Sequence, residues 1–359
     1  NYLYIIFFSI FAIINTSTIN EGTVPFTATD MHLLNRLSSF VPSLDNKYII
    51  FVNTLWDQES TKYYTNLQYI ESPEFSKTDS LKSTLPLNVT IPELGQSDSN
   101  PVFSSEFPDY LFFIRSKNGT SQLYYIDFPP KENSEPVQLT SYELDVSNVK
   151  FLKNTLVFST DVYYDCEDFA CTKKRDDEVA ARGANTYSIY TKLMMRHWDI
   201  WYTEGKASHP FYQKIIKDGT VPKLEGNPID LMKFKEYCSP PVENGAEQFS
   251  ISDDGNLISF SAHAKDKKMS YNTKWDIFIY DINKGETKEI TAAEKGRCQN
   301  PTFKPGDSEN KLAFLCMEHY GLESDRLSMR IYTPSTENYE KENFDISQAV
   351  NSFIWYPKG

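Results

Sequence analysis

Short apolar segments that alternate with polar residues recur along most of the chain, and turn residues separate them. The stretch QFSISDDGNLISFSAH, Gln248 to His263, shows the pattern of an apolar strand, a tight turn and a second apolar strand. Comparable stretches begin at Ser38, Pro101, Val149 and Pro301. Alternation with a period of two residues predicts strands, and turn residues between two such runs predict hairpins. We therefore expect an all-β fold built from repeated hairpins.

A third alternating run follows most of these hairpins, and a short polar run then completes a group of four. Asp253, Pro305 and Pro357 occupy equivalent turn positions at intervals of 52 residues, close to the period of about 40 to 50 residues of propeller blades. The repeat predicts a β-propeller of four-stranded blades, with five blades plus the start of a sixth. The five predicted blades cover residues 35–72, 96–141, 144–216, 245–291 and 297–346, and the sixth begins at Asn351.

One long segment, about residues 161–211, interrupts the third predicted blade. Its apolar residues fall at helical spacing (i, i+3, i+4, i+7, i+8, i+11), namely Tyr190, Leu193, Met194, His197, Trp198 and Trp201. That spacing places them on one face of an α-helix. We therefore expect a helical insertion in the third blade, packed on the propeller or on a neighbouring domain.

Composition and charge narrow the possible partners. The chain has 359 residues, 40% of them hydrophobic, with 23 Tyr and 24 Phe, which favours a large β-rich core. The formal net charge is -13, so nucleic acid is not expected as a partner. The run KKR, Lys173 to Arg175, is followed at once by acidic residues, and we expect a solvated loop there.

The first residues predict a leader for secretion. Residues 3–14 (LYIIFFSIFAII) form an apolar run that fits the core of a signal peptide and is short for a membrane span of about 20 residues. We expect a signal peptide at residues 1–20, a propeller domain at residues 21–359 and no membrane span beyond the leader. A buried hydrophobic strand is the alternative. Glycosylation sequons at Asn88 and Asn118 agree with a secreted protein or one in the lumen of the secretory or lysosomal pathway.

The five cysteines allow two disulfides in an oxidising compartment. Cys298 and Cys316 flank a predicted hairpin, so strand pairing places them opposite each other. Cys166 and Cys171 are close enough in sequence for a second bridge, which leaves Cys238 without a partner. The sequence has no CxxC pair and its histidines are scattered, so we expect neither a metal nor another cofactor.

Two stretches of the chain resemble a known family. RHWDIW (Arg196 to Trp201), followed by GKASHPF, and SPPVENGAEQFSISDDGNLISFSA (Ser239 to Ala262) are similar to the propeller domain of prolyl-oligopeptidase-like (S9) serine peptidases, in the dipeptidyl-peptidase V and acylaminoacyl-peptidase branch. The resemblance implies a C-terminal α/β-hydrolase domain with a Ser nucleophile in a G-x-S-x-G turn. No G-x-S-x-G occurs here, so we expect that this chain lacks the hydrolase domain and contains no catalytic residue.

The resemblance also implies a function for the propeller itself. In the family it limits access to the active site and holds small peptides, so we expect the substrate-gating part of a secreted peptidase that removes dipeptides or acyl-amino acids from peptide N-termini. Arg196, Trp198 and Asp199 are the candidate substrate-binding residues. An Arg196–Asp199 ion pair that fixes the local structure is the alternative role for these charges. A non-catalytic secreted propeller that acts as a binding module is the alternative function.

Overall fold

The computed structural model describes residues 25–72, 85–184, 187–191, 194–242, 244–341 and 348–356. These residues form strands and few helices, as the sequence predicted. The chain divides into two compact units, Asn1–Pro101 and Val102–Gly359, and each is described by itself. The predicted signal peptide, residues 1–20, lies outside the described residues. No helix in the described part of the chain is long and apolar enough to cross a membrane.

The first unit contains one short helix and an antiparallel sheet. Helix α2 (Ala28–Leu33) begins at Thr27, whose side chain accepts a hydrogen bond from the Asp30 backbone N–H while the Asp30 carboxylate accepts from the Thr27 N–H; this reciprocal capping satisfies two free N–H groups. Strands pair in chain order, and their bounds are β1 (Arg36–Pro42), β2 (Tyr48–Asp57), β3 (Lys62–Glu71) and β4 (Leu87–Asn88). Strand β5 (Gln96–Phe103) pairs in parallel with β3 at Thr65 and Ser97.

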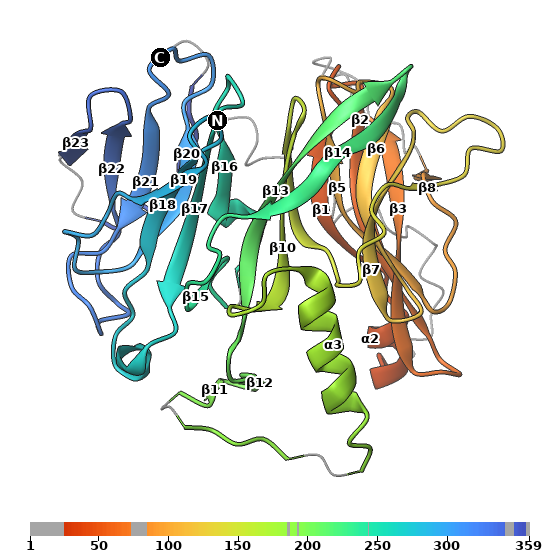
Figure 1. Ribbon diagram of the computed structural model, residues 1–359. Helices are drawn as coiled ribbons and strands as arrows, with labels where there is room; N and C mark the ends of the chain where they lie inside the picture. Colours follow the sequence, from red (N-terminus) through yellow and green to blue (C-terminus); the bar gives the residue numbers. More distant parts are fainter. Residues whose placement is uncertain are drawn as a thin grey trace. The chain divides into compact units, whose positions relative to one another are not determined.

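The second unit contains successive antiparallel sheets in sequence order (Figure 1). A hairpin of β6 (Tyr110–Lys117) and β7 (Thr120–Asp127) is extended by β8 (Val137–Gln138). The next sheet contains β9 (Ser147–Leu152), β10 (Thr155–Tyr163), β13 (Lys206–Asp218) and β14 (Val221–Asp230). A further sheet contains β15 (Tyr237–Cys238), β16 (Phe249–Ile251), β17 (Leu257–Ala264), β18 (Asp276–Asp281) and β19 (Glu286–Glu289). The last sheet contains β20 (Cys298–Phe303), β21 (Leu312–Cys316), β22 (Ser328–Thr333) and β23 (Asn338–Lys341).

These strand groups follow the predicted repeat closely. The third group is longer than predicted, because β13 continues past Ile216 to Asp218 and β14 continues to Asp230. Strand β14 is rich in charged and polar residues with little alternation, so its sequence carries a weak strand pattern. Pairing with the long, buried strand β13 holds it in the sheet.

Successive sheets of the second unit pack face to face. Alternate residues of one strand reach opposite cores: Leu156 and Phe158 of β10 pack with β6, β7 and β9, while Val157 packs with β16 and β17. Strand β18 does the same, with Phe278 on one side and Ile277 on the other, toward β20 and β21. Each fully buried side chain of this kind contributes about 1.5–3 kcal/mol through burial of apolar surface. The apolar alternation of the sequence is therefore explained by sheets that are covered on both faces.

Turns between the first and second strands also join neighbouring sheets. The Ser104 hydroxyl donates to the carbonyl oxygen of Lys153 (2.6 Å). The Lys153 ammonium donates in turn to the carbonyl oxygen of Asp253. One sheet further, the Asn310 side-chain amide donates to the Asp254 carboxylate (3.0 Å). The same turn position thus makes a polar contact to the next sheet three times in succession.

The segment between β10 and β13 contains a helix, but not at the predicted residues. Helix α3 spans Phe169–Ala180 and includes the KKR run, which is therefore not a loop. The Asp168 carboxylate accepts from the Cys171 N–H at its start (2.8 Å), and Lys173 pairs with Asp177 one turn later. Capping and opposite charges at i, i+4 stabilise such a polar helix.

The predicted helix at residues 190–201 is wrong. Arg196–His197 and Ile200–Trp201 instead form a small hairpin of strands β11 and β12. Met194 (φ 68°) and Trp198 (φ 50°) adopt left-handed backbone conformations that end any right-handed helix there. Trp198, Ile200 and Trp201 are exposed, so no apolar face is buried that could have stabilised a helix. Leu193 lies outside the described residues.

The predicted sixth blade does not begin as a strand at Asn351, since residues 351–356 contain no strand and residues 357–359 lie outside the described part. The Trp355 indole N–H donates to the carbonyl oxygen of Thr302 (2.9 Å), and Phe353 packs against Leu315, Met317 and Leu327. These contacts hold the segment against the last sheet as an irregular stretch.

Candidate functional site

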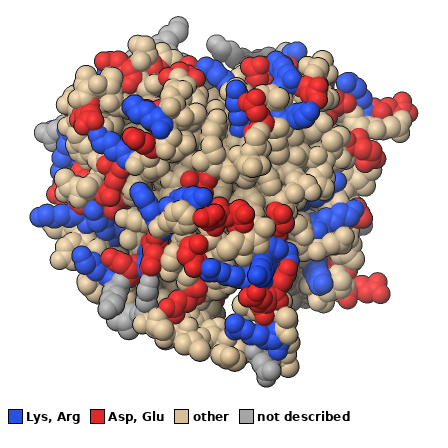
Figure 2. All heavy atoms as spheres, in the orientation of Figure 1, with Lys and Arg blue, Asp and Glu red and all other residues tan. Residues whose placement is uncertain are grey.

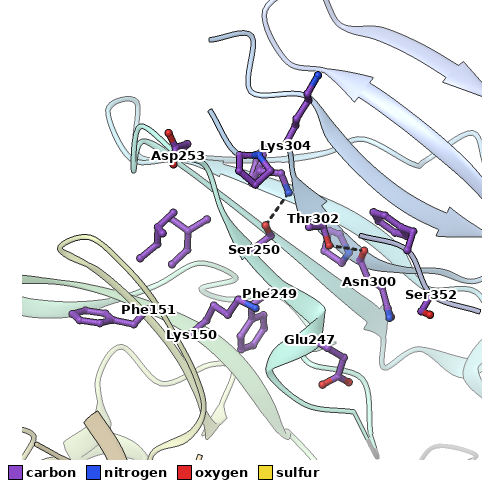
Figure 3. Close-up of a pocket in the computed structure, with 16 residues that line it drawn as sticks. Lys150, Phe151, Glu247, Phe249, Ser250, Asp253, Asn300, Thr302, Lys304 and Ser352 are labelled. Atoms are coloured by element: carbon purple, nitrogen blue, oxygen red, sulfur yellow. Dashed lines mark hydrogen bonds between the residues drawn. The ribbon is translucent and has the colours of Figure 1, made fainter. Parts of the chain in front are cut away.

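A cavity of about 380 Å³ lies where the first strands of three successive sheets meet (Figure 3). Strand β9 contributes Lys150, Phe151 and Leu152, the β16 region contributes residues between Glu247 and Asp253, and β20 with its turn contributes Asn300 to Pro305. Ser352 and Phe353 complete the lining. The volume lies within the range of about 300–1,000 Å³ that is typical of small-ligand pockets.

Two of the three strands, β9 and β20, have equivalent residues at or next to this cavity. In β9 and β20 an Asn with left-handed backbone conformation, Asn148 (φ 52°) and Asn300 (φ 56°), is followed three residues later by a Phe. The pairing register shifts next to each Asn, which indicates a β-bulge. Asn tolerates positive φ better than most residues. The spacing Asn-x-x-Phe is therefore a sequence signal for these strands, and the expectations from sequence missed it.

Buried hydrogen bonds fix the wall between β16 and β20. The Gln248 side-chain amide donates to Asn300 Oδ1 (2.8 Å), and the Asn300 backbone N–H donates to Gln248 Oε1 (3.0 Å). The Ser250 hydroxyl oxygen accepts from the Phe303 N–H (3.0 Å). Gln248 and Ser250 are both buried. If the two strands moved apart, these buried polar groups would lose their hydrogen-bond partners at a cost in free energy, so the bonds fix the spacing of the strands.

Both signs of charge occur at the cavity. Burial by the surrounding protein lowers the pKa of the Lys150 ammonium, and the nearby Glu247 carboxylate opposes that shift. The Lys150 side chain remains exposed to solvent, so solvent partly screens its charge. On the opposite wall, the Lys304 ammonium lies 5.7 Å from the Trp355 ring centroid. The cavity can therefore contact a ligand that carries a cation and an anion, such as a short peptide.

The charged side chains that line this cavity are those of Lys150, Glu247, Asp253 and Lys304. Its lining contains no His or Cys, so neither a His base nor a thiol nucleophile is present. Within the described ranges no group of three His, Cys, Asp or Glu side chains is arranged to hold a metal ion. The arrangement suits binding.

The predicted substrate-binding residues lie elsewhere, on the β11–β12 hairpin. Arg196, Trp198 and Asp199 together line an open, shallow depression. Arg196 donates to the Trp198 carbonyl oxygen (3.1 Å), and its guanidinium lies 5.5 Å from the Trp201 ring centroid. In the part of the chain that the structure describes, Arg196 forms no ion pair with Asp199. The structure thus brings the three residues together, but not at the cavity lined by β9, β16 and β20.

The cysteines form two disulfides, Cys166–Cys171 and Cys298–Cys316. The second one joins directly opposed residues of β20 and β21. Cys238 is free and buried, and burial raises the pKa of its thiol to about 12, so it is a poor nucleophile at neutral pH.

Both sequon asparagines are exposed. Asn88 lies on β4, where its side-chain oxygen accepts from the Asn66 and Gln68 amides (both 3.0 Å). Asn118 lies in the turn between β6 and β7. Glycosylation at either residue stays a prediction.

Charges on the molecular surface are mixed. Figure 2 shows Lys and Arg side chains interspersed with Asp and Glu over the face in view, with no extended patch of one sign. A basic surface for nucleic acid is not seen on this face.

Comparisons with known proteins identify the class. No family model matches the chain. The chain is 30% identical over 174 residues to dipeptidyl-peptidase 5 of Porphyromonas gingivalis, which covers 48% of this chain and 24% of that protein. It is 23% identical over 269 residues to a probable dipeptidyl-peptidase 5 of Aspergillus niger, covering 68% of this chain and 36% of that protein. Among solved structures, a puromycin hydrolase is similar with a TM-score of 0.50, at 10% identity, over 86% of this chain and 37% of that one.

The matched part of the chain is therefore similar to prolyl-oligopeptidase-like (S9) peptidases, which supports an S9 peptidase-like domain, as the sequence resemblance indicated. Its named relatives above are dipeptidyl-peptidase 5 proteins. The matches span well under half the length of those relatives.

Proposed function

We propose that this chain is the substrate-gating β-propeller of a secreted serine peptidase that removes dipeptides or acyl-amino acids from peptide N-termini. The observation that carries the proposal is the cavity at the first strands of three successive sheets, in a chain related to dipeptidyl-peptidase 5. In a propeller the first strand of each blade borders the central channel. We therefore propose that this cavity is part of the central channel of the propeller.

The strand groups support the propeller. The last three sheets each contain four antiparallel strands joined in sequence order, with β15 as an additional strand of the middle sheet, and each sheet packs its faces against the next. The repeated contacts between hairpin turns, from Ser104 to Asn310, are those expected when equivalent blades follow one another around an axis. We assign the strand groups that begin with β1, β5, β9, β16 and β20 as five blades.

The chemistry of peptide cleavage is assigned to another part of the parent protein. The sequence contains no G-x-S-x-G turn to present a Ser nucleophile. Nucleophile, base and oxyanion donors act as a unit, so this chain alone is proposed to hydrolyse nothing. An α/β-hydrolase domain of the same parent is the proposed partner that supplies them.

The role of this chain is then selection of the substrate. A cavity of about 380 Å³ admits a short peptide and excludes a folded protein. Lys150 and Lys304 offer cations, and Glu247 and Asp253 offer carboxylates, to the two ends of a zwitterionic peptide. Small peptides are the proposed ligands.

The proposed compartment is the secretory pathway or the cell exterior. Two disulfides agree with an oxidising compartment. The apolar run at residues 3–14 and the exposed sequons at Asn88 and Asn118 agree with export.

The test compares residues 25–359 with the protein translated from the complete gene. Both are assayed with chromogenic dipeptidyl and acyl-aminoacyl substrates and labelled with a fluorophosphonate serine probe. We expect turnover and labelling in the long protein alone. Labelled activity in residues 25–359 would contradict the proposal, and so would a complete gene that encodes no hydrolase domain. The second result would favour the alternative, a non-catalytic binding module that uses the same cavity.

A further inference from the structure

Arg297 is a half-buried cationic residue of the second unit that forms no ion pair within the described part of the chain. Its guanidinium stacks on Trp275, with 4.9 Å from the carbon centre to the ring centroid. Its Nε atom is buried and, within the described residues, has no hydrogen-bond partner. Neither Nη atom is buried in this way, so the outer edge of the guanidinium remains open. A planar cation with one protected face and an open edge is suited to receive a carboxylate.

Arg330, in the same sheet, shows how this fold treats an arginine with a purely structural role. Its Nε atom donates to the Glu294 carboxylate (2.8 Å), and one Nη donates to the Ser328 hydroxyl (2.7 Å). Buried charges in proteins are normally paired in this way. Arg297 is half-buried and lacks such a pair among the described residues, so packing alone does not explain its charge.

The backbone around Arg297 is held firmly. The Arg297 carbonyl oxygen accepts from the Met317 N–H (2.9 Å), and the next residue, Cys298, donates its N–H to Trp275 O (3.0 Å) and forms a disulfide with Cys316. On the other side, a Cβ at Gly296 would lie 2.4 Å from the Met317 carbonyl oxygen, so only glycine fits. The cation is therefore presented in a fixed position, which reduces the entropy lost on binding.

Burial and one nearby carboxylate act on the Arg297 cation in opposite directions. Burial lowers the pKa of Arg297, and Glu323 in the β21–β22 loop opposes this shift from beyond ion-pair distance. A bound anion would compensate the partly desolvated cation as Arg–carboxylate pairs do. Trp275, on which Arg297 stacks, lies in the β17–β18 loop together with Lys265, and Lys265 donates to the Lys206 carbonyl oxygen (2.7 Å) at the start of β13. The segment between β10 and β13 carries the Arg196 hairpin in Figure 1.

We propose that Arg297, stacked on Trp275, is an anchor for the carboxylate of a peptide ligand. The carboxylate comes either from the C-terminus of a short peptide or from an acidic side chain. The choice of a peptide as its carrier rests on the proposed function, but binding is a property of this chain alone.

The test measures binding of three tetrapeptides to the chain by calorimetry. The probes are Ala-Ala-Ala-Ala with a free C-terminus, the same peptide as C-terminal amide, and Ala-Glu-Ala-Ala amide. We expect at least one carboxylate-bearing probe to bind about tenfold more tightly than the neutral amide, since bidentate Arg–carboxylate pairs are strong. The probe that binds more tightly identifies the source of the carboxylate, either the peptide C-terminus or an acidic side chain.

Variants separate the anchor from a structural role. Arg297→Gln is expected to remove the tenfold preference, Arg297→Lys to remove most of it, and Glu323→Gln to strengthen binding about threefold because a competing carboxylate is lost. Arg182→Gln, at an exposed arginine on the β10–β13 segment, carries the same charge change and should leave the preference intact.

Equal binding of acid and amide probes, or an unchanged preference in Arg297→Gln, overturns the proposal. So does a Glu323→Gln variant that loses thermal stability without tighter binding, since Glu323 would then be the structural counterion. If the parent protein shows no peptidase activity, the proposed function is contradicted, but the binding of carboxylate probes at Arg297 is still decided by the measurements above.

Discussion

Gln248 and Asn300 form a reciprocal pair of hydrogen bonds. The Gln248 side-chain amide donates to Asn300 Oδ1, and the Asn300 backbone N–H donates to Gln248 Oε1. Gln248 is 1% exposed. Asn300 sits at the bulge of β20, with a backbone conformation that the β20–β21 pairing does not hold by itself. A buried amide on the neighbouring sheet therefore fixes the bulge and with it one wall of the cavity.

Replacement of Gln248 by Leu is expected to destabilise the chain by about 1–3 kcal/mol, because the Asn300 N–H loses its partner in a buried place. Urea unfolding followed by fluorescence measures the change. Gln58→Leu, at an exposed turn residue, is the matched control and should change stability by less than about 0.5 kcal/mol. Equal effects of the two substitutions would show that the Gln248 pair contributes nothing.

The Arg330–Glu294 pair predicts a larger effect. Arg330 is 2% exposed, and the Tyr339 hydroxyl also donates to Glu294 (2.5 Å). Glu294→Gln leaves a buried guanidinium without its counterion and is expected to cost about 3–5 kcal/mol. The double variant Arg330→Met/Glu294→Leu should be more stable than Glu294→Gln, since it removes both charges. Denaturant midpoints test this order, and the reverse order would show that the pair itself supplies the stability.

His263 predicts a dependence of stability on pH. Burial, followed by the electrostatic influence of Lys265 and His197, lowers the pKa of His263 to about 3. The folded chain thus holds the neutral imidazole, whereas the unfolded chain takes up a proton near its ordinary value of about 6.5. The resulting stability is present above pH 6.5 and is lost as the pH falls from there toward 3. The free energy of unfolding should fall over this range, and His263→Phe should flatten the fall. An unchanged slope in that variant would place the pH dependence on other groups.

The disulfide between Cys298 and Cys316 predicts a sensitivity to reduction. It closes a loop with a sequence separation of 18, for which the chain-entropy estimate is about 3 kcal/mol. Both residues are 0% exposed, so a reductant should act on the unfolded chain first. Unfolding midpoints with and without dithiothreitol measure the contribution, with Cys298→Ala/Cys316→Ala as the variant. Identical midpoints in all samples would contradict it.

The sequence predicted what depends on local alternation and missed what depends on packing. Period-two apolar runs identified the strands of the second unit, because sheets covered on both faces need apolar residues at alternating positions. The helix expected at residues 190–201 failed because the same spacing arose in a hairpin whose aromatic residues are exposed. Helix α3 was missed because its stability comes from capping and charge pairs, with few apolar contacts.

The cavity could not be predicted from spacing. Lys150, Ser250 and Thr302 lie about fifty to one hundred and fifty residues apart, and only the stacking of three sheets brings them together. The Asn-x-x-Phe repeat was visible at Asn148 and Asn300, but its meaning depends on positive backbone angles that composition does not reveal. Arg297 shows the same limit, because an unpaired charge is recognised only when its neighbours are known.

The hairpin residues Trp198 and Asp199 give the last prediction, which concerns the parent peptidase. Trp198 is 75% exposed, and Asp199 is exposed as well, so neither side chain contributes much to packing. If they hold substrate on the side of this domain that faces the proposed hydrolase domain, Trp198→Ala and Asp199→Asn should raise KM about three- to tenfold. Thermal stability should change little, because surface substitutions alter it by about 0.5 kcal/mol or less. Steady-state kinetics with a dipeptidyl substrate and a thermal melt of the same samples make the measurement, and Tyr187→Ala, at another exposed aromatic residue of the segment, is the control. Unchanged KM together with a lowered melting temperature would mean that the hairpin residues stabilise the fold and do not contact substrate.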